Sequence, residues 1–216
     1  MEYIGTDMGN IRQPIEEVYR DLTVSLNVVF LLTVVFALRF IPLPVSIETI
    51  AWLFVAQADP SPAWVLAPLL HQGIVHLTAN IGQLLYFGII PERKLQTREY
   101  IVFLAITGIL SIMIEVVRYN IREIEGGMAG ASGATMAVMG FAVASIGLYY
   151  LGYTENPGIS DRGNLRISLF LFGLYWIIVQ LFSDFYPGWT LSPSASGVAH
   201  LLGIILGAGY AVLKAR

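Results

Sequence analysis

Residues 132–151 read SGATMAVMGFAVASIGLYYL, a run of twenty residues without a charged side chain. A helix needs about 20 mostly apolar residues to cross roughly 30 Å of hydrocarbon, so this stretch predicts a membrane-spanning helix. Gly133, Gly140 and Gly147 recur every seven residues and form a strip beside Ser132. Because a strip without side chains lets a second helix approach closely, the stretch predicts a tightly packed span.

Five further stretches have a similar length and polarity. They cover residues 22–41, 70–90, 100–117, 167–185 and 198–213. Between the first two lies a long connection, whose piece IETIAWLFVA is too short to span and fits a segment lying partway into the membrane. The predicted fold is an all-α membrane protein with six transmembrane helices and a long, partly membrane-embedded first loop. We expect a cytoplasmic segment over residues 1–21 and one membrane domain over residues 22–216.

Composition supports the bilayer as the solvent of this chain. Hydrophobic residues make up 56% and charged residues 12%, which leaves too little polar surface to coat a water-soluble globule. The net charge of −3 and the scattered basic residues argue against nucleic acid as a partner. The absence of cysteine excludes disulfides, thiolate catalysis and Cys-ligated zinc. We expect no cofactor.

The distribution of basic residues predicts the orientation, because short cytoplasmic loops collect Lys and Arg. With the N-terminus inside, nine of the twelve basic residues lie on the inner side. These nine are Arg12, Arg20, Arg93, Lys94, Arg98, Arg162, Arg166, Lys214 and Arg216. We therefore expect a multi-pass integral membrane protein with both termini in the cytoplasm. The compact form without targeting extensions or a cleavable signal peptide favours a prokaryotic plasma membrane.

Three polar clusters interrupt the apolar spans. The first is HQGIVHLTAN, which contains His71 and places His76 and Asn80 four residues apart on one helix face. The second is GASG with Gly130 and Ser132, and the third is AHLLGIILG with His200. Polar groups within spans are costly, so they are candidates for function or for hydrogen bonds between helices. By the predicted topology, all three clusters lie near the outer face.

Each cluster also has a structural interpretation. GASG and the GxxxG of Gly203 and Gly207 are typical of close helix packing, and a single histidine often bonds a neighbouring helix. His71 and His76 together suggest a metal, but a spacing of five separates them by about 140° on a helix. There is no HExxH motif and no carboxylate nearby, so we expect no metal site.

The glycines favour a catalytic interpretation. Gly203 and Gly207 lie within about 60° of His200 around the sixth predicted helix, and the fourth helix has its own glycine strip. Two helices smoothed in this way can bring the Ser132 Oγ atom to a ring nitrogen of His200. A serine nucleophile needs such a base, because an unassisted hydroxyl is weak at neutral pH.

The motifs H-x4-H-x3-N, G-x-S-G and A-H-x-x-G-x-x-x-G occur in this order on the second, fourth and sixth predicted spans. In this combination the chain resembles the rhomboid intramembrane proteases over about residues 52–210. The resemblance implies that Ser132 is the nucleophile and His200 the general base and acid. It also implies an oxyanion hole formed by His76, Asn80 and the backbone N–H of Ser132, with Gly130 leaving room for the close backbone approach.

The chain departs from the family pattern at several positions. Trp64 is followed by Val65 instead of the arginine of the Trp-Arg pair in the first loop of many relatives. Met136 stands where several bacterial relatives have a tyrosine that stacks on the catalytic histidine, although a thioether can also contact an imidazole ring. We expect Glu92 to be a solvated loop charge, and His71 to line a water path or to fill an interfacial polar role.

The expected function is that of an intramembrane serine endopeptidase with a Ser-His dyad. We expect the outer acids to lie in or beside loops, which leaves no third member behind His200. These acids are Glu115, Glu123, Glu125 and Asp184. The expected partners are the lipid bilayer and transmembrane protein substrates, which would be cut near the outer end of their spans after approaching beside the fifth helix. Residues 186–196, rich in Pro, Gly and Ser, would form a lid, and the sequence specifies no oligomeric state.

Two other functions compete. A catalytically inactive rhomboid-like protein that binds or escorts membrane proteins would keep the frame and lose the nucleophile or the base, yet both residues are present. A transporter would show paired half-repeats, broken helices and charges within its spans, and we identify none of these in the sequence.

Overall fold

The computed structural model describes residues 22–42, 44–155, 163–185 and 197–215. The predicted lid at 186–196 and the predicted cytoplasmic segment at 1–21 lie outside these residues. The helices are α2 (Thr23–Leu38), α3 (Ile47–Phe54), α4 (Ala63–Leu66), the 3-10 helix η1 (Ala67–Leu69), α5 (Ile74–Phe87), α6 (Ile89–Lys94), α7 (Thr97–Ile121), α8 (Ser132–Tyr150), α9 (Gly163–Phe185) and α10 (Gly197–Lys214). Within the described residues the fold is all-helical, with one isolated β-bridge between Ala56 and Met128.

Among the described residues, five segments are long and apolar enough to cross a membrane, and they support a multi-pass integral membrane protein. They are Ile74–Lys94, Thr97–Ile121, Ser132–Tyr150, Asn164–Phe182 and Gly197–Lys214. The apolar helix α2 has 16 residues, or about 24 Å at 1.5 Å per residue, which is shorter than the hydrocarbon core. The sixth span and the embedding of the first loop therefore stay predictions.

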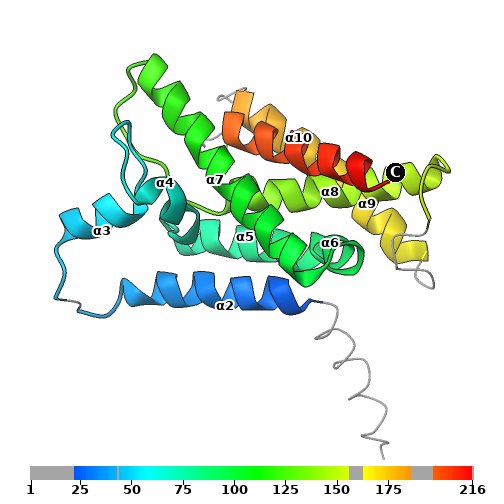
Figure 1. The fold of residues 1–216 in the computed structure, drawn as a ribbon, viewed down its shortest axis with the longest axis horizontal. Helices are drawn as coiled ribbons and strands as arrows, with labels where there is room; N and C mark the ends of the chain where they lie inside the picture. Colours follow the sequence, from blue (N-terminus) through cyan, green and yellow to red (C-terminus); the bar gives the residue numbers. More distant parts are fainter. Residues whose placement is uncertain (1–21, 43, 156–162, 186–196, 216) are drawn as a thin grey trace, which may run out of the picture.

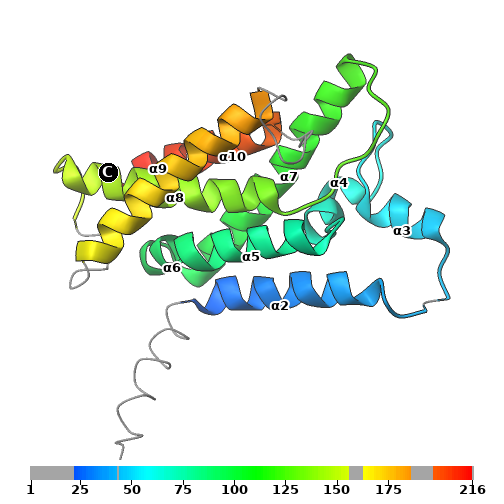
Figure 2. The same cartoon turned by 180° about the vertical axis from the view of Figure 1, so that it is seen from behind.

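Helix α8 lies at the centre of the bundle, with α5, α7, α9 and α10 around it (Figures 1 and 2). At its contact with α10, glycines let the two backbones lie close together. A Cβ atom added to Gly203 would overlap the carbonyl oxygen of Gly133, and one added to Gly207 would overlap that of Ala137. Only glycine allows the two backbones to lie this close.

The glycine strip of α8 does not form a single interface, which corrects the sequence interpretation. A Cβ atom at Gly133 would overlap Ser111 of α7, whereas one at Gly140 would lie 2.5 Å from the Ile204 carbonyl oxygen of α10. Gly147 faces Phe170 of α9 instead. A period of seven drifts by about 20° per repeat on a straight helix, so successive glycines in a buried helix meet different neighbours.

One end of the bundle, called the basic end here, contains Lys94, Arg98 and Lys214. There the Glu92 carboxylate accepts a hydrogen bond from the Ser25 backbone N–H at 2.7 Å. Glu92 is half-buried in α6, so the expectation of a solvated loop charge is wrong. The hydrogen bond ties α2 to the rest of the bundle.

At the opposite end, called the site end, the first loop packs on the C-terminal part of α7. Ala56, Ala63 and Ala67 are completely buried, in a cluster that also contains Ile112 and Val116 of α7. The indole N–H of Trp64 donates to the Gln57 carbonyl oxygen at 2.9 Å. The loop therefore docks through small side chains, without the arginine that many relatives place after the tryptophan.

Candidate functional site

The segment that leads into α8 is fixed by backbone hydrogen bonds to the first loop. Met128 exchanges two such bonds with Ala56, at 2.8 and 2.9 Å, and the Gly130 N–H donates to the Ala67 carbonyl oxygen at 2.9 Å. Gly130 has a φ of +132°, which a residue with a side chain rarely adopts. A Cβ atom at Gly130 would also lie 2.6 Å from the Cε1 atom of His76. Both the backbone conformation and the lack of space therefore require glycine at position 130. The absence of a side chain lets the His76 ring lie against the backbone that precedes Ser132.

Ser132 is the first residue of α8 and is half-buried. Backbone N–H groups in the first turn of a helix have no intrahelical acceptor, so they are available to other groups. The positive end of the helix dipole is at the same place, which favours negative charge beside Ser132. The position combines a serine hydroxyl with a local preference for an anion.

Asn80 is buried in α5 and is held by three neighbours. Its Nδ2 atom lies 3.0 Å from the Nε2 atom of His71 and 3.0 Å from the backbone oxygen of His76. Its Oδ1 atom accepts a hydrogen bond from the Thr135 hydroxyl at 3.0 Å. Both amide hydrogens therefore have an acceptor, and this arrangement fixes which way the amide faces.

His71 precedes α5 instead of lying on it, so the separation of 140° from His76 inferred for a continuous helix is wrong. The two rings make an edge-to-face contact with centroids 5.1 Å apart. His71 is 1% exposed, and its Nε2 atom accepts from Asn80 and lies 3.5 Å from the Ala131 N–H. A nitrogen that accepts has no proton, which assigns the neutral tautomer with the hydrogen on Nδ1. The described residues contain no group of three side chains able to hold a metal ion.

His200 is buried in the first turn of α10. Its Nδ1 atom lies 3.4 Å from the amide nitrogen of Gln180 on α9. Gly203 lies one turn further along α10, at the carbonyl of Gly133. Because α8 and α10 are parallel, this register places His200 level with the start of α8. Gly130, Ser132, His76 and His200 are thus gathered at one end of the bundle.

Met136 is 2% exposed and lies at the contact between α8 and α10. A Cβ atom at Gly203 would be 3.2 Å from the Met136 Cβ atom. The side chain therefore starts about one turn below Ser132 along α8 and beside the turn that follows His200. A flexible thioether fills the irregular space between these two helices.

Glu115 was misplaced by the sequence interpretation. It lies within α7, is 0% exposed, and accepts hydrogen bonds from the backbone N–H groups of Val198 and Ala199 at 2.9 and 3.0 Å. Its second carboxylate oxygen accepts from Arg118. An acid in an apolar span was itself a signal of function. It was discounted because the predicted span ended only two residues later.

Thr135 and Gln180 were also missed. Thr135 stands one turn after Ser132, and its hydroxyl lies 2.9 Å from Gln83, 3.0 Å from Asn80 and 3.1 Å from the Ser132 carbonyl oxygen. The spacing of three residues from Ser132 could have indicated Thr135, because residues three apart share a helix face. No local pattern connects Gln180 to His200, since they lie on different helices.

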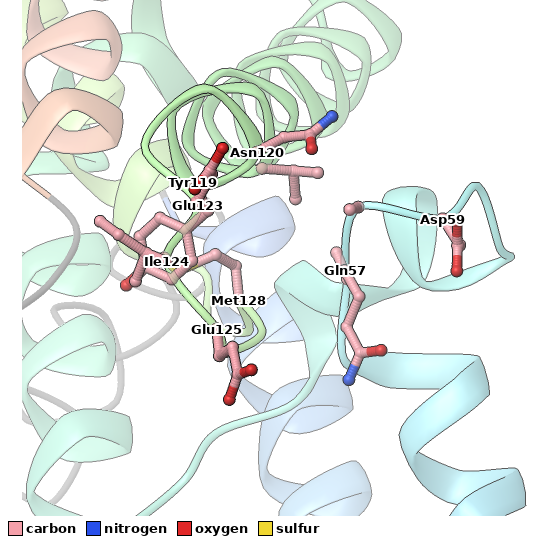
Figure 3. A pocket seen from close by; sticks show the side chains of 12 residues that line it. Gln57, Asp59, Tyr119, Asn120, Glu123, Ile124, Glu125 and Met128 are labelled. Carbon is pink, nitrogen blue, oxygen red and sulfur yellow. The ribbon is translucent and has the colours of Figure 1, made fainter.

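A pocket of about 390 Å³ lies at the site end of the bundle (Figure 3). It is formed by residues of the first loop, including Gln57 and Asp59, and by the C-terminal end of α7 and the segment after it. Its lining includes the acids Asp59, Glu123 and Glu125, together with Met128. None of the candidate catalytic residues lines it, so the pocket and the Ser-His cluster are separate features.

The fold and the site define a polytopic helical membrane protein with a cluster of buried and half-buried serine, histidine and asparagine residues at one end. The family model named Rhomboid domain matches residues 62–216, a range that includes every candidate site residue. The chain therefore belongs to the rhomboid family, most of whose members are intramembrane serine proteases, alongside inactive ones. No curated protein matches the chain.

Proposed function

We propose that the protein is an intramembrane serine endopeptidase that cleaves transmembrane proteins near the outer end of their spans with a dyad of Ser132 and His200. The register of α10 on α8 is the observation that carries this proposal. Gly203 abuts the Gly133 carbonyl, so His200 stands level with Ser132. Membership of the rhomboid family agrees with it.

In the proposed reaction, the Ser132 hydroxyl attacks the carbonyl carbon of a peptide bond while His200 accepts its proton. His200 then returns the proton to the leaving amine, which gives an acyl-enzyme on Ser132. A water molecule, activated by His200, hydrolyses this ester and restores the hydroxyl. The amide of Gln180 could orient the imidazole through Nδ1, because an amide offers a donor or an acceptor according to the way it faces.

The negative charge on the carbonyl oxygen would be stabilised by His76, Asn80 and the Ser132 backbone N–H. Loss of one such donor typically costs about 2.7 to 4 kcal/mol of transition-state stabilisation. Both hydrogens of the Asn80 amide have acceptors without substrate, so binding an oxyanion would exchange one of these bonds. His71 and Thr135 would act as supports that keep the amide near its working position.

The remaining parts of the proposal concern the membrane. We propose six spans with both termini in the cytoplasm of a prokaryotic cell, and a site open to water at the outer face. Substrates would approach beside α9, whose span is only 11% buried, compared with 67% for α8. A substrate helix must unwind before its carbonyl reaches Ser132, which would favour helix-breaking residues near the cut.

The test is cleavage of a single-span reporter protein by the purified protein in liposomes. Wild type is compared with Ser132→Ala, His200→Ala and the matched control Ser145→Ala, which changes a second serine of α8. We expect cleavage by wild type and by the control, and none by the two dyad variants. Cleavage that survives Ser132→Ala would sink the mechanism.

Labelling with a fluorophosphonate, which reacts with activated serines, separates the proposal from its alternative. If wild type is labelled and Ser132→Ala is not, Ser132 is supported as an active nucleophile. This result would hold even for an enzyme that does not cleave the chosen reporter. Intact reporters together with an unlabelled Ser132 would favour an inactive rhomboid-like protein that binds or escorts membrane proteins.

A further inference from the structure

Glu115 is the one acid among the residues described within the predicted span at 100–117, and its side chain is completely buried. A carboxylate at membrane depth is costly unless its charge and its lone pairs have partners. Here one oxygen accepts two backbone hydrogen bonds from α10, and the other accepts from the Arg118 side chain. Glu115 is thus satisfied by contacts that join α7 to α10.

The two N–H groups belong to the first turn of α10. The first N–H groups of a helix have no intrahelical acceptor and are normally capped by a side chain just before the helix. At α10 a carboxylate from a different helix accepts from Val198 and Ala199. These residues immediately precede His200, so the cap fixes the turn of helix on which the proposed base stands.

The contacts of Glu115 indicate positioning and not proton transfer. Its carboxylate already accepts two backbone N–H groups and the Arg118 guanidinium, which together leave little capacity to bond an imidazole. A charged cap also interacts favourably with the positive end of the helix dipole. These contacts fix the first turn of α10 both along the helix axis and in its rotation about that axis.

A second carboxylate provides a natural comparison on the same two helices. Glu99, at the opposite end of α7, accepts from Tyr210 and pairs with Lys214 of α10. Glu99 and Glu115 therefore tie the two ends of α10 to the two ends of α7. The Glu99 side chain is 24% exposed and lies at the basic end. Glu115 is completely buried and bonds the two residues that precede His200.

We propose that Glu115 is a positioning residue that sets the first turn of α10 so that the His200 ring meets the Ser132 hydroxyl. This inference rests on the proposed function. It goes beyond the Ser-His dyad by assigning a role to a residue on α7 that touches neither the substrate nor the reacting atoms. A misplacement of about 1 Å can cost about a hundredfold in rate, so a helix cap next to a catalytic base can affect turnover strongly.

The test compares Glu115→Gln and Glu115→Ala with the matched control Glu99→Gln in liposomes. Each variant is measured for kcat and KM on the reporter, for the rate of fluorophosphonate labelling of Ser132, and for thermal stability. Glutamine keeps one oxygen for the two N–H groups but loses the charge, and alanine removes the cap. We expect kcat and the labelling rate to fall about tenfold in Glu115→Gln and about a hundredfold in Glu115→Ala, with KM unchanged.

Glu99→Gln should lower the melting temperature and leave kcat within about twofold of wild type, because the turn that contains His200 is unaffected. Equal losses of kcat in Glu99→Gln and Glu115→Gln would overturn the inference, since general stability would then explain both. If wild type is active and Glu115→Gln has the same kcat, the inference about Glu115 would be overturned and the proposed function would stand. Absence of cleavage and labelling in wild type would instead overturn the proposed function and this inference together. If Glu115→Ala does not fold, Glu115→Gln and its control decide the matter.

Discussion

Helices α8 and α9 have the same length of apolar span, 19 residues, yet they occupy different places in the molecule. The mean hydropathy of α9 is higher, at 1.9 against 1.4 for α8, but 67% of the α8 span is buried and only 11% of the α9 span. Hydropathy therefore identifies a span without indicating its neighbours. Small residues decide which helix can lie at the centre, because they let backbones approach.

The side chains on the surfaces of the two helices explain this difference in burial. Helix α8 shows Gly, Ala, Ser and Thr at its contacts, whereas α9 carries large side chains such as Leu171, Tyr175 and Ile178, each more than half exposed. Helix α9 is attached at a few points, among them a hydrogen bond of 2.7 Å between Tyr86 and Ser168. In a membrane its exposed face is turned to lipid or to an incoming helix.

The largest effect is expected where α10 meets α8. Gly207→Ala would force a Cβ atom into the Ala137 carbonyl oxygen, a backbone atom that cannot rotate away. We expect a loss of about 3 kcal/mol in the free energy of unfolding, with loss of any cleavage. Thermal unfolding in detergent measures it. Gly209→Ala on the same helix meets nothing within 4 Å and should be neutral, so a similar loss there would contradict the explanation by close packing.

A smaller effect is expected at Leu169, where a large side chain of α9 is completely buried in the core. Leu169 is 0% exposed and Leu171 is 58% exposed, so the pair compares the two faces of this helix. Leu169→Ala should cost about 2 kcal/mol through lost contacts and a cavity. Leu171→Ala should change the free energy of unfolding by less than about 0.5 kcal/mol. Equal losses in the same unfolding measurement would mean that α9 packs on both faces, against the contrast drawn with α8.

His71→Ala tests the polar support below the start of α8. The change removes the acceptor of one Asn80 amide hydrogen in a buried site, which should cost about 1 to 2 kcal/mol. Reporter cleavage should fall as well, because the Asn80 amide loses its fixed position. Thr78→Ala is the control, since that exposed hydroxyl bonds only to carbonyl oxygens of its own helix. Unchanged stability and cleavage in His71→Ala would remove the supporting role from His71.

The smallest effect should have the opposite sign. Ser145 is buried in α8, and among the described residues its hydroxyl has no hydrogen-bond partner. Ser145→Ala removes this unsatisfied group and should raise the free energy of unfolding by up to about 1 kcal/mol. A clear decrease in the melting temperature would show that the hydroxyl has a partner within the folded protein.

The sequence predicted the positions of the spans better than their ends. The third span was expected at 100–117, whereas α7 runs from Thr97 to Ile121. Its start is set by a capping box between Gln96 and Glu99, which are polar residues that a hydropathy argument excludes. Similarly, the second span was expected from residue 70, but the extended backbone at Gly73 delays α5 to Ile74.

The polar residues of the candidate site could be selected from the sequence because they interrupt apolar spans. Their partners could not, because the contacts join helices far apart in the chain. Thr135 and Asn80 are 55 positions apart, and Glu115 and Val198 are 83 apart. The roles of Ser132, His200, His76 and Asn80 stay predictions, which the cleavage experiment tests.

The contact between Glu115 and α10 has a consequence for biosynthesis. A chain emerging from the ribosome inserts α7, with its buried acid and Arg118, long before the N–H groups of Val198 and Ala199 exist. Until then the nucleophile and its neighbours are present without a base, and the carboxylate lacks two of its donors. Helix α10 supplies both together, so on the proposed function a nascent chain stays inactive in the membrane until α10 has been synthesised.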